Sequence, residues 1–547
     1  MQRLPDYPNV LLKSQAQLGP KAVPGRNLPG AAPRPADIRQ CILDFIRLLG
    51  TSGMLSPTES PGSDADQLNT IIPALLQLME IVGSGDPAEE PLEEPITQEE
   101  LDDLQKKLTG MLKPDSNNEV SRDVQHGVLV KLPGIQGVLN WFSNTVSERS
   151  TQVLDIPPDA TKKMLDMLRK SPPKNIFHEI YSLCFASTLV HDVNGKQKDL
   201  QTRLQELLES LLPQIGGLEG TRRKGWKLVW GPVIWKMKPE DDSGGPDLAW
   251  YIACDESVIC WDDDEPRPTY VIAIAGTQTR SVHTWLNSNF DVTVPIDFKS
   301  WVSHLRADPN TLNLPEANVA LGGPYLARGT ARTVWQLLTE KAPQGAQAQG
   351  KSLLEFLKSK SQSNPEVRFI TTGHSLGGAL SPTLALVLVE VDAILRDSIL
   401  TYPIAGPSPG NDALAAFFSE TLLPIPAKHD DLPEDKRYQV WNSNLVNKYD
   451  PVPQAWCADE RTCPKQNLQN ILNIIPESFF KTVFSTVIES VSEDLAKAKV
   501  RYMPLRSRIF AARPSESLKD VRPQHTGAYH EYVGITPPDL LKALELD

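Results

Sequence analysis

The sequence predicts an α/β fold for its second half, a mostly parallel sheet flanked by helices, preceded by an all-helical N-terminal region. From residue 225 onward, short runs of aromatic and β-branched residues alternate with segments of helical periodicity, a pattern typical of parallel strands joined by helices. Before that point apolar residues recur at three- and four-residue spacings, which indicates amphipathic helices. A chain of 547 residues has room for roughly two to four domains.

The part before the predicted sheet divides into two segments. Residues 1–35 carry seven prolines, and because proline has no backbone N–H to donate, we expect an arm without regular structure. Residues 36–173 are predicted to form a helical region of unknown role, in which Thr97 and Glu100 have the spacing of a capping box. Residues 174–547 are predicted to form the α/β domain.

The elements of the α/β domain follow in order. Two helices, 174–192 and 196–213, precede three strands in "WKLVWGPVIWKM", "LAWYIACD" and "TYVIAIAG". Strands and helices then alternate: helices at 324–340 and 351–360, a strand at 367–372, a helix at 376–394, a strand at 398–403, a helix at 411–420 and a strand at 437–447.

Composition argues against several partners and locations. The net charge of −13 is spread along the chain without a basic patch, so no nucleic-acid partner is expected. The best candidate for a membrane span, 379–395, is interrupted by Pro382, Glu390 and other polar residues. The first residues lack the basic start and apolar core of a secretory signal. We therefore expect a cytoplasmic protein, with secretion by another route left open.

The six cysteines include two close pairs, Cys254 with Cys260 and Cys457 with Cys463. Either pair has a spacing that allows a small disulfide loop, but reduced thiols are the expectation for a cytosolic chain. Neither pair has the CxxC spacing of a zinc site, and no histidine cluster accompanies them. No bound metal is expected.

The stretch "RFITTGHSLGGAL" contains a G-x-S-x-G motif centred on Ser375. A predicted strand leads into it and a predicted helix leads out, which is the setting of a nucleophile elbow. The glycines two before and two after the serine are needed because the turn leaves no room for a Cβ. Ser375 is therefore the predicted nucleophile, and the competing interpretation is a small residue in a tight turn.

A serine nucleophile requires a base and an orienting carboxylate, which follow it in the order acid and then histidine when the serine lies on such an elbow. Asp450 ends the last predicted strand, which points its carboxylate to the same sheet edge as Ser375. Asp430 and Asp431 lie in a charged loop and are expected to be solvated, and Asp412 is expected to cap a helix.

Two histidines, His525 and His530, follow Asp450 in the sequence. His525 comes after an extended Pro-Gln segment and is favoured as the base, because a loop suits a mobile base. His530 falls one turn into the next helix, where a surface role is expected, and is kept as the alternative base. His374 is interpreted as a packing and hydrogen-bonding residue beneath the elbow.

The negatively charged intermediate of acyl transfer needs two hydrogen-bond donors. The backbone N–H of Leu376 is one candidate, since it follows the nucleophile. Thr277 is the other, because it follows a strand that ends at Gly276. A Gly-Thr turn that caps the next helix is the alternative for the Thr277 hydroxyl.

These motifs, in this order, resemble those of the class 3 lipase family of α/β-hydrolases over roughly residues 225–540. The resemblance implies that Ser375 is the nucleophile, Asp450 the acid and His525 the base, with Thr277 and Leu376 as the oxyanion hole. It also implies that Trp285 lies in a lid segment over the substrate. Residues 464–520 are predicted to be a helical insertion relative to the family.

The expected activity is hydrolysis of carboxylic esters of lipids through an acyl-enzyme, without a metal or cofactor, as the resemblance implies. The expected partner is an apolar acyl ester. Transient contact with a membrane or lipid-droplet surface is left open, since amphipathic helices in a bundle normally bury their apolar faces against each other. Two alternatives stay open. One is a catalytically silent binding or scaffold protein on the same fold, and the other is an esterase that acts on polyester or thioester substrates.

Overall fold

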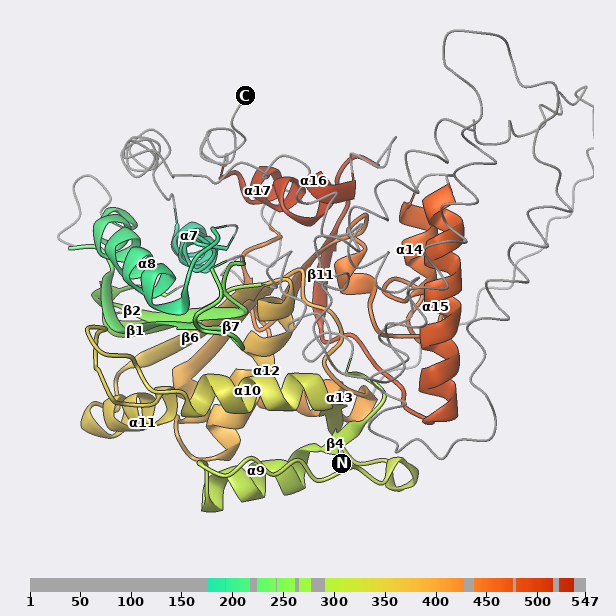
Figure 1. The fold of residues 1–547 in the computed structure, drawn as a ribbon, viewed down its shortest axis with the longest axis horizontal. Helices are drawn as coiled ribbons and strands as arrows, with labels where there is room; N and C mark the ends of the chain where they lie inside the picture. The colour runs from blue at the N-terminus through green and yellow to red at the C-terminus, as the bar shows by residue number, and fades with distance from the viewer. Residues whose placement is uncertain are drawn as a thin grey trace, which may run out of the picture. The chain divides into compact units, whose positions relative to one another are not determined.

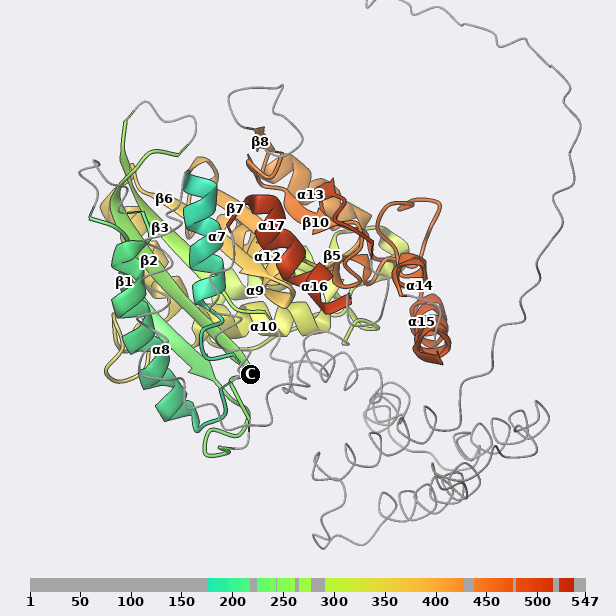
Figure 2. The ribbon, with the colours of Figure 1, turned by 90° about the horizontal axis from the view of Figure 1, so that it is seen from above.

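The computed structural model describes residues 175–191, 193–216, 224–242, 244–260, 265–276, 291–426, 437–475, 479–514 and 521–535. The predicted arm 1–35 and the predicted helical region 36–173 lie outside these residues. The described part is built on a seven-stranded sheet in the order β1-β2-β3-β6-β7-β10-β11 (Figures 1 and 2). Its strands are β1 (Lys227–Trp235), β2 (Leu248–Val258), β3 (Arg267–Ile274), β6 (Arg368–His374), β7 (Ile399–Ile404), β10 (Asn444–Asn447) and β11 (Ser507–Phe510).

The sheet is mostly parallel, as predicted. Strands β3, β6, β7, β10 and β11 run parallel, and β1 and β2 add two antiparallel strands at one edge. The edge strand β1 contains Pro232 and shifts register there, which fits the confinement of proline to edges and bulges. The carboxyl ends of the five parallel strands meet at one edge of the sheet, where α/β proteins place their sites.

Helices cover both faces of the sheet (Figure 1). One face carries α7 (Ile176–Ala186), α8 (Gln197–Leu211), α16 (Val521–His525) and α17 (Gly527–Val533). The opposite face carries α9 (Phe298–Ala307), α10 (Arg328–Thr339), α11 (Leu353–Ser363), α12 (Leu376–Glu390) and α13 (Asp412–Thr421). The helices and strands predicted between residues 174 and 420 thus appear in the predicted order, with shifted ends.

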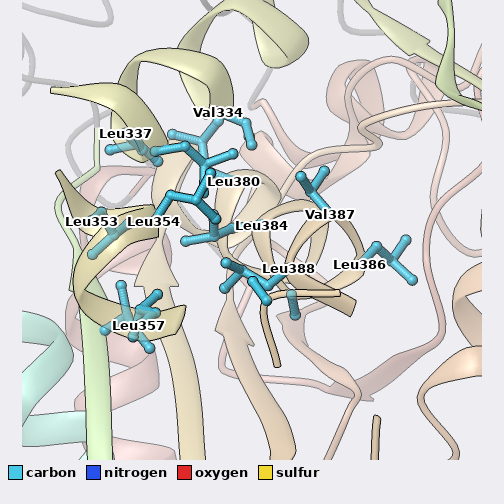
Figure 3. Close-up of a cluster of buried hydrophobic side chains, with 14 of the residues drawn as sticks. Val334, Leu337, Leu353, Leu354, Leu357, Leu380, Leu384, Leu386, Val387 and Leu388 are labelled. Atoms are coloured by element: carbon cyan, nitrogen blue, oxygen red, sulfur yellow. The ribbon is translucent and has the colours of Figure 1, made fainter. Parts of the chain in front are cut away.

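Two hydrophobic cores result, one on each face. In β2 alternate residues divide between them: Trp250 and Ile252 face the core with α10, α11 and α12, whereas Tyr251 and Ala253 face the core with α7 and α8. Figure 3 shows the first core, where leucines of α10, α11 and α12 meet. Burial on both faces explains why the central strands are continuous apolar runs in the sequence.

The structure differs from the sequence prediction in two strands. The strand predicted at 437–447 is broken into β9 (Val440–Trp441) and β10, because Asn442 adopts a positive φ of 59° between them. The segment 464–520, predicted as helical insertion, contains α14 (Gln469–Ile474) and α15 (Phe479–Lys497) but also β11, the last strand of the sheet. β11 is four residues long and half exposed, so it lacks the apolar run of a central strand.

Smaller elements complete the described part. β4 (Pro295–Asp297) pairs with β5 (Tyr325–Ala327), and β8 (Ile425–Pro426) pairs with β9. Short 3₁₀ helices cover Leu212–Gln214, Val319–Leu321, Arg396–Ser398 and Val452–Gln454. The helix α13 is capped by the side chain of Asn411, not by Asp412 as predicted, since Asn411 Oδ1 accepts from the backbone N–H of Leu414.

The five cysteines in the described part, including both close pairs, are buried free thiols. Burial raises the pKa of Cys184, Cys254 and Cys457 to about 12, so these thiols stay protonated at neutral pH. Within the described ranges, no cluster of three His, Cys, Asp or Glu side chains is arranged to hold a metal ion. Over the same ranges, no helix combines the length and apolar character that a membrane span requires.

Candidate active site

Ser375 lies at the sharp turn between β6 and α12, with φ 60° and ψ −122°. Such a backbone is strained for a residue with a Cβ and is kept only where the surrounding structure enforces it. Here two glycines allow the surrounding backbone to pack closely against the turn. A Cβ on Gly373 would lie 2.3 Å from the Gly377 carbonyl oxygen, and a Cβ on Gly377 would lie 2.4 Å from the Ile274 carbonyl oxygen. The predicted strand, turn and helix are thus present, with the glycines packed as predicted.

The Ser375 side chain is not used to cap its own helix. Its backbone N–H donates to the Ile404 carbonyl oxygen at 3.0 Å, which ties the turn to the neighbouring strand β7. Leu376 is the first residue of α12, and the first backbone N–H groups of a helix have no partner inside it. The turn therefore places a hydroxyl beside the positive end of a helix dipole.

Asp450 lies in the loop that follows β10, and its side chain is fully buried. Three donors hold its carboxylate. Oδ1 accepts from the backbone N–H of Val452 at 2.9 Å, and Oδ2 accepts from the Tyr529 hydroxyl at 2.7 Å and from His525 at 2.9 Å. A buried charge of this kind is stable only when it is fully hydrogen-bonded, as Asp450 is.

His525 ends α16, on the chain that follows β11, and its side chain is 16% exposed. Its Nδ1 lies 2.9 Å from Asp450 Oδ2. Because a carboxylate accepts, the proton belongs on Nδ1 and Nε2 is left with a free lone pair. His525 was predicted to follow an extended segment, but Pro523 and Gln524 are helical. The mobile loop expected for this histidine is instead a short helix anchored by its neighbours.

His374 joins the serine turn to His525. Its Nε2 donates to the His525 carbonyl oxygen at 2.7 Å, and the two imidazole rings lie 4.4 Å apart between centroids. Burial and the neighbouring His525 ring lower the pKa of His374 well below its usual range, so it is neutral. His374 has the packing and hydrogen-bonding place that the sequence predicted, next to Ser375 and against the backbone of His525.

His530 is buried in α17, not exposed as predicted. Its Nδ1 lies 2.9 Å from the Tyr181 hydroxyl of α7, and its ring packs on Phe185. Burial lowers the pKa of His530 to about 4, because the charged imidazolium is poorly solvated there. The Asp450 carboxylate is paired with His525, and His530 instead links α17 to α7. The misprediction has a simple cause, since the sequence did not reveal that α7 covers this helix.

The two remaining predicted residues, Thr277 and Trp285, lie outside the described residues. The strand that leads to Thr277 is described as far as Gly276. A Cβ on Gly276 would come within 2.8 Å of the His374 carbonyl oxygen and 3.1 Å of the Ser375 Cβ. The end of this strand therefore touches the serine turn.

Three further residues support the site and were not predicted: Tyr529, Asn447 and Gln524. Tyr529 is fully buried and lies four residues after His525, about one helical turn. Asn447 ends β10 and binds Gln524 through its side chain. The spacing of His525 and Tyr529 was visible in the sequence, but only the fold brings Tyr529 to Asp450.

The chain is similar to a lipase family in sequence and to solved lipases in structure. Residues 271–459 match the family model of the class 3 lipases. This match confirms the resemblance predicted from the sequence and the expected class of enzyme, a carboxylic ester hydrolase of the lipase type. No curated protein matches the chain in sequence.

Solved structures of lipases are similar to the chain. The crystal structure of M37 lipase matches with 20% identity and a TM-score of 0.50, over 68% of this chain and 96% of that one. A lipase from Rhizopus microsporus var. chinensis matches with 14% identity and a TM-score of 0.28, over 51% of this chain and 69% of that one. The Rhizomucor miehei lipase propeptide complex matches with 19% identity and a TM-score of 0.22, over 38% and 48%. The similarity to M37 lipase supports the lipase fold.

Proposed function

We propose that this chain hydrolyses carboxylic esters of lipids through Ser375, with His525 as base and Asp450 as the acid that orients it. The observation that carries the proposal is the hydrogen bond between His525 and the buried carboxylate of Asp450, beside the strained serine turn. The three residues follow β6, β10 and β11 and so lie at the carboxyl edge of the same parallel strands. Their order along the chain is the one that this type of elbow requires.

In the first half of the reaction, His525 Nε2 removes the proton from Ser375 as its Oγ attacks the ester carbonyl carbon. Asp450 keeps the other imidazole proton on Nδ1 and stabilises the imidazolium that forms. The tetrahedral intermediate then collapses, and His525 gives its proton to the departing alcohol. The acyl group remains on Ser375 as an ester.

In the second half, water repeats the sequence on the acyl-enzyme. His525 takes a proton from the water, the new tetrahedral intermediate releases Ser375, and the free acid leaves. The backbone N–H of Leu376 stabilises the oxyanion in both intermediates, and we propose Thr277 as the second donor. Trp285 is proposed to lie in a segment that covers the acyl chain.

The proposed substrate is an acylglycerol or another apolar acyl ester. Support comes from the match to the class 3 lipase family model. Long-chain esters aggregate in water or dissolve in membranes, so the proposal includes transient contact with a membrane or lipid-droplet surface. Activity on soluble and emulsified esters of increasing chain length tests this part separately.

The central test is Ser375→Ala, with 4-nitrophenyl butyrate as the soluble ester. We expect turnover to fall to background, and a fluorophosphonate probe to label the wild type but not the variant. Ser381→Ala is the matched control, since Ser381 is a buried serine on the same helix whose hydroxyl has no partner in the described part. Undiminished hydrolysis by Ser375→Ala would overturn the proposal.

The same assay and label, extended to thioester and polyester substrates, separate the two alternatives. A catalytically silent scaffold protein gives no turnover with any ester and no labelling of Ser375. An enzyme that prefers thioesters or polyesters is labelled, and hydrolyses those substrates faster than the oxygen esters of glycerol.

A further inference from the structure

We propose that Asn447 is a positioning residue that sets the geometry of both His525 and Asp450. This inference rests on the proposed function, because it assigns Asn447 to the hydrolytic reaction of that site. Asn447 is the last residue of β10, three residues before Asp450, and is fully buried. It does not touch the reacting atoms and acts through its neighbours Gln524 and Tyr529.

The Asn447 side chain holds the short helix that carries His525. Its Nδ2 donates to the Gln524 carbonyl oxygen at 3.0 Å and to the Gln524 side-chain oxygen at 2.8 Å. Gln524 in turn donates to the Arg513 carbonyl oxygen. Since Gln524 immediately precedes His525, these bonds fix the backbone from which the imidazole projects.

The Asn447 backbone is hydrogen-bonded to Tyr529 and to Asp450, and so positions the Asp450 carboxylate. Its N–H donates to the Tyr529 hydroxyl at 3.0 Å, and that hydroxyl donates to Asp450 Oδ2. The Asn447 carbonyl oxygen accepts from the Asp450 N–H at 3.0 Å. Asn447 is therefore hydrogen-bonded both to the segment that carries His525 and to the groups that hold Asp450.

The side-chain oxygen of Asn447 completes the arrangement. It accepts from the backbone N–H of Tyr449 and of Ala512, each at 3.2 Å. Ala512 lies just after β11, so the chain after β10 and the chain after β11 are held together at this point. An asparagine is required because one end must donate and the other must accept. Aspartate has nearly the same shape but no side-chain N–H.

The need for such an anchor follows from the length of α16. It has five residues, and a helix this short is not stable by itself. The orientation of His525 must therefore come from tertiary contacts. Asn447 supplies such contacts through Gln524, the residue that precedes His525. A displacement of about 1 Å at a catalytic group costs about 100-fold in rate.

The test measures kcat and KM for 4-nitrophenyl butyrate in Asn447→Ala and Asn447→Asp, alone and combined with His525→Ala. We expect kcat to fall about 100-fold in either single variant with KM changed less than about twofold. In the His525→Ala background the same substitutions should change the residual rate less than about twofold, because the residue they position is gone. Asn447→Asp keeps the side-chain size and serves where Asn447→Ala does not fold.

Asn411→Ala is the matched control. Asn411 is also buried, and its side chain makes three hydrogen bonds, to Tyr325, Leu414 and Gly323, away from His525. We expect its kcat to equal that of the wild type. An unchanged kcat in folded Asn447→Asp, or equal losses with and without His525, overturns the inference. Failure of the proposed function looks different, since wild type and Ser375→Ala then hydrolyse the ester at the same rate.

Discussion

Tyr529 and His525 donate to the same carboxylate oxygen, Oδ2 of Asp450, at 2.7 and 2.9 Å. Burial and the adjacent carboxylate raise the pKa of Tyr529 well above its usual value, so its hydroxyl stays protonated and remains a donor. The tyrosine therefore fixes the position of Asp450 independently of the charge state of His525. Without it, Oδ2 would be held by His525 alone.

Tyr529→Phe should lower kcat/KM for a soluble ester by roughly tenfold, because a charge-assisted hydrogen bond of about 1.5 kcal/mol is lost from the oriented pair. The backbone N–H of Asn447 also loses its acceptor, so the protein should unfold at a lower denaturant concentration. Tyr270→Phe is the control, because Tyr270 is a buried tyrosine near the amino ends of the parallel strands, away from the carboxyl ends that carry the site. Equal activity of Tyr529→Phe and Tyr270→Phe would contradict this role.

Gly373→Ala should destabilise the protein by about 3 kcal/mol, because overpacking in a rigid turn forces the backbone to move. The new Cβ would lie 2.3 Å from the Gly377 carbonyl oxygen. Thermal unfolding measures the loss, and ester hydrolysis should fall as the serine turn shifts. Gly244→Ala is the comparison, since a Cβ there meets no atom within 4 Å. Similar melting temperatures for the two variants would show that the serine turn accommodates a Cβ on residue 373, which contradicts the prediction.

His530 should make the stability of the protein depend on pH. Its pKa is lowered from 6.5 to about 4, so the unfolded chain binds a proton at a higher pH than the folded protein does. Stability from this group is complete above pH 6.5 and is lost as the pH falls toward 4. The difference between these pKa values corresponds to about 3 kcal/mol.

The check is the unfolding free energy of His530→Gln from pH 7 to pH 4. Glutamine does not titrate, so the curve of this variant should be flatter than that of the wild type by about that amount. His304→Gln, an exposed histidine on α9, should leave the slope unchanged. His374 is also neutral through burial and contributes in the same direction, so some slope should remain. Parallel curves for wild type and His530→Gln would refute the assignment.

Lys236 should contribute to stability without any effect on catalysis. Its ammonium group donates to three carbonyl oxygens, those of Gly195, Asp241 and Gly244, at 2.6 to 2.7 Å. Lys236→Met removes these three hydrogen bonds and should cost about 3 kcal/mol of unfolding free energy. Because β1 is separated from β6 by two strands, kcat should not change. Lys227→Met, at an exposed position of β1, should change neither quantity.

The sequence by itself determined the local parts of this protein. The strand, turn and helix around Ser375 are encoded by apolar strand residues, two bracketing glycines and a helical run, which are neighbours in the chain. The alternation of strands and helices likewise predicted a mostly parallel sheet. The sequence also predicted Asp450 as the acid and His525 as the base, because the acid and then the histidine follow the serine in the chain on this type of elbow.

The tertiary structure decided how those residues are held. The extended segment predicted before His525 is a short helix, and a helix of this length depends on contacts with residues distant in the chain. His530 was predicted to be exposed, but α7, about 350 residues earlier in the sequence, buries it. Strand β11 is too short and too exposed for an apolar pattern to reveal it.

Sequence patterns record which face of an element is apolar, and so they report local structure well. They do not record which distant backbone groups a buried polar side chain will meet. Asn447, Gln524 and Tyr529 form hydrogen bonds across 65 to 82 residues of sequence, and each looks ordinary in its own segment. Their roles exist only because the sheet order brings β10 and β11 side by side.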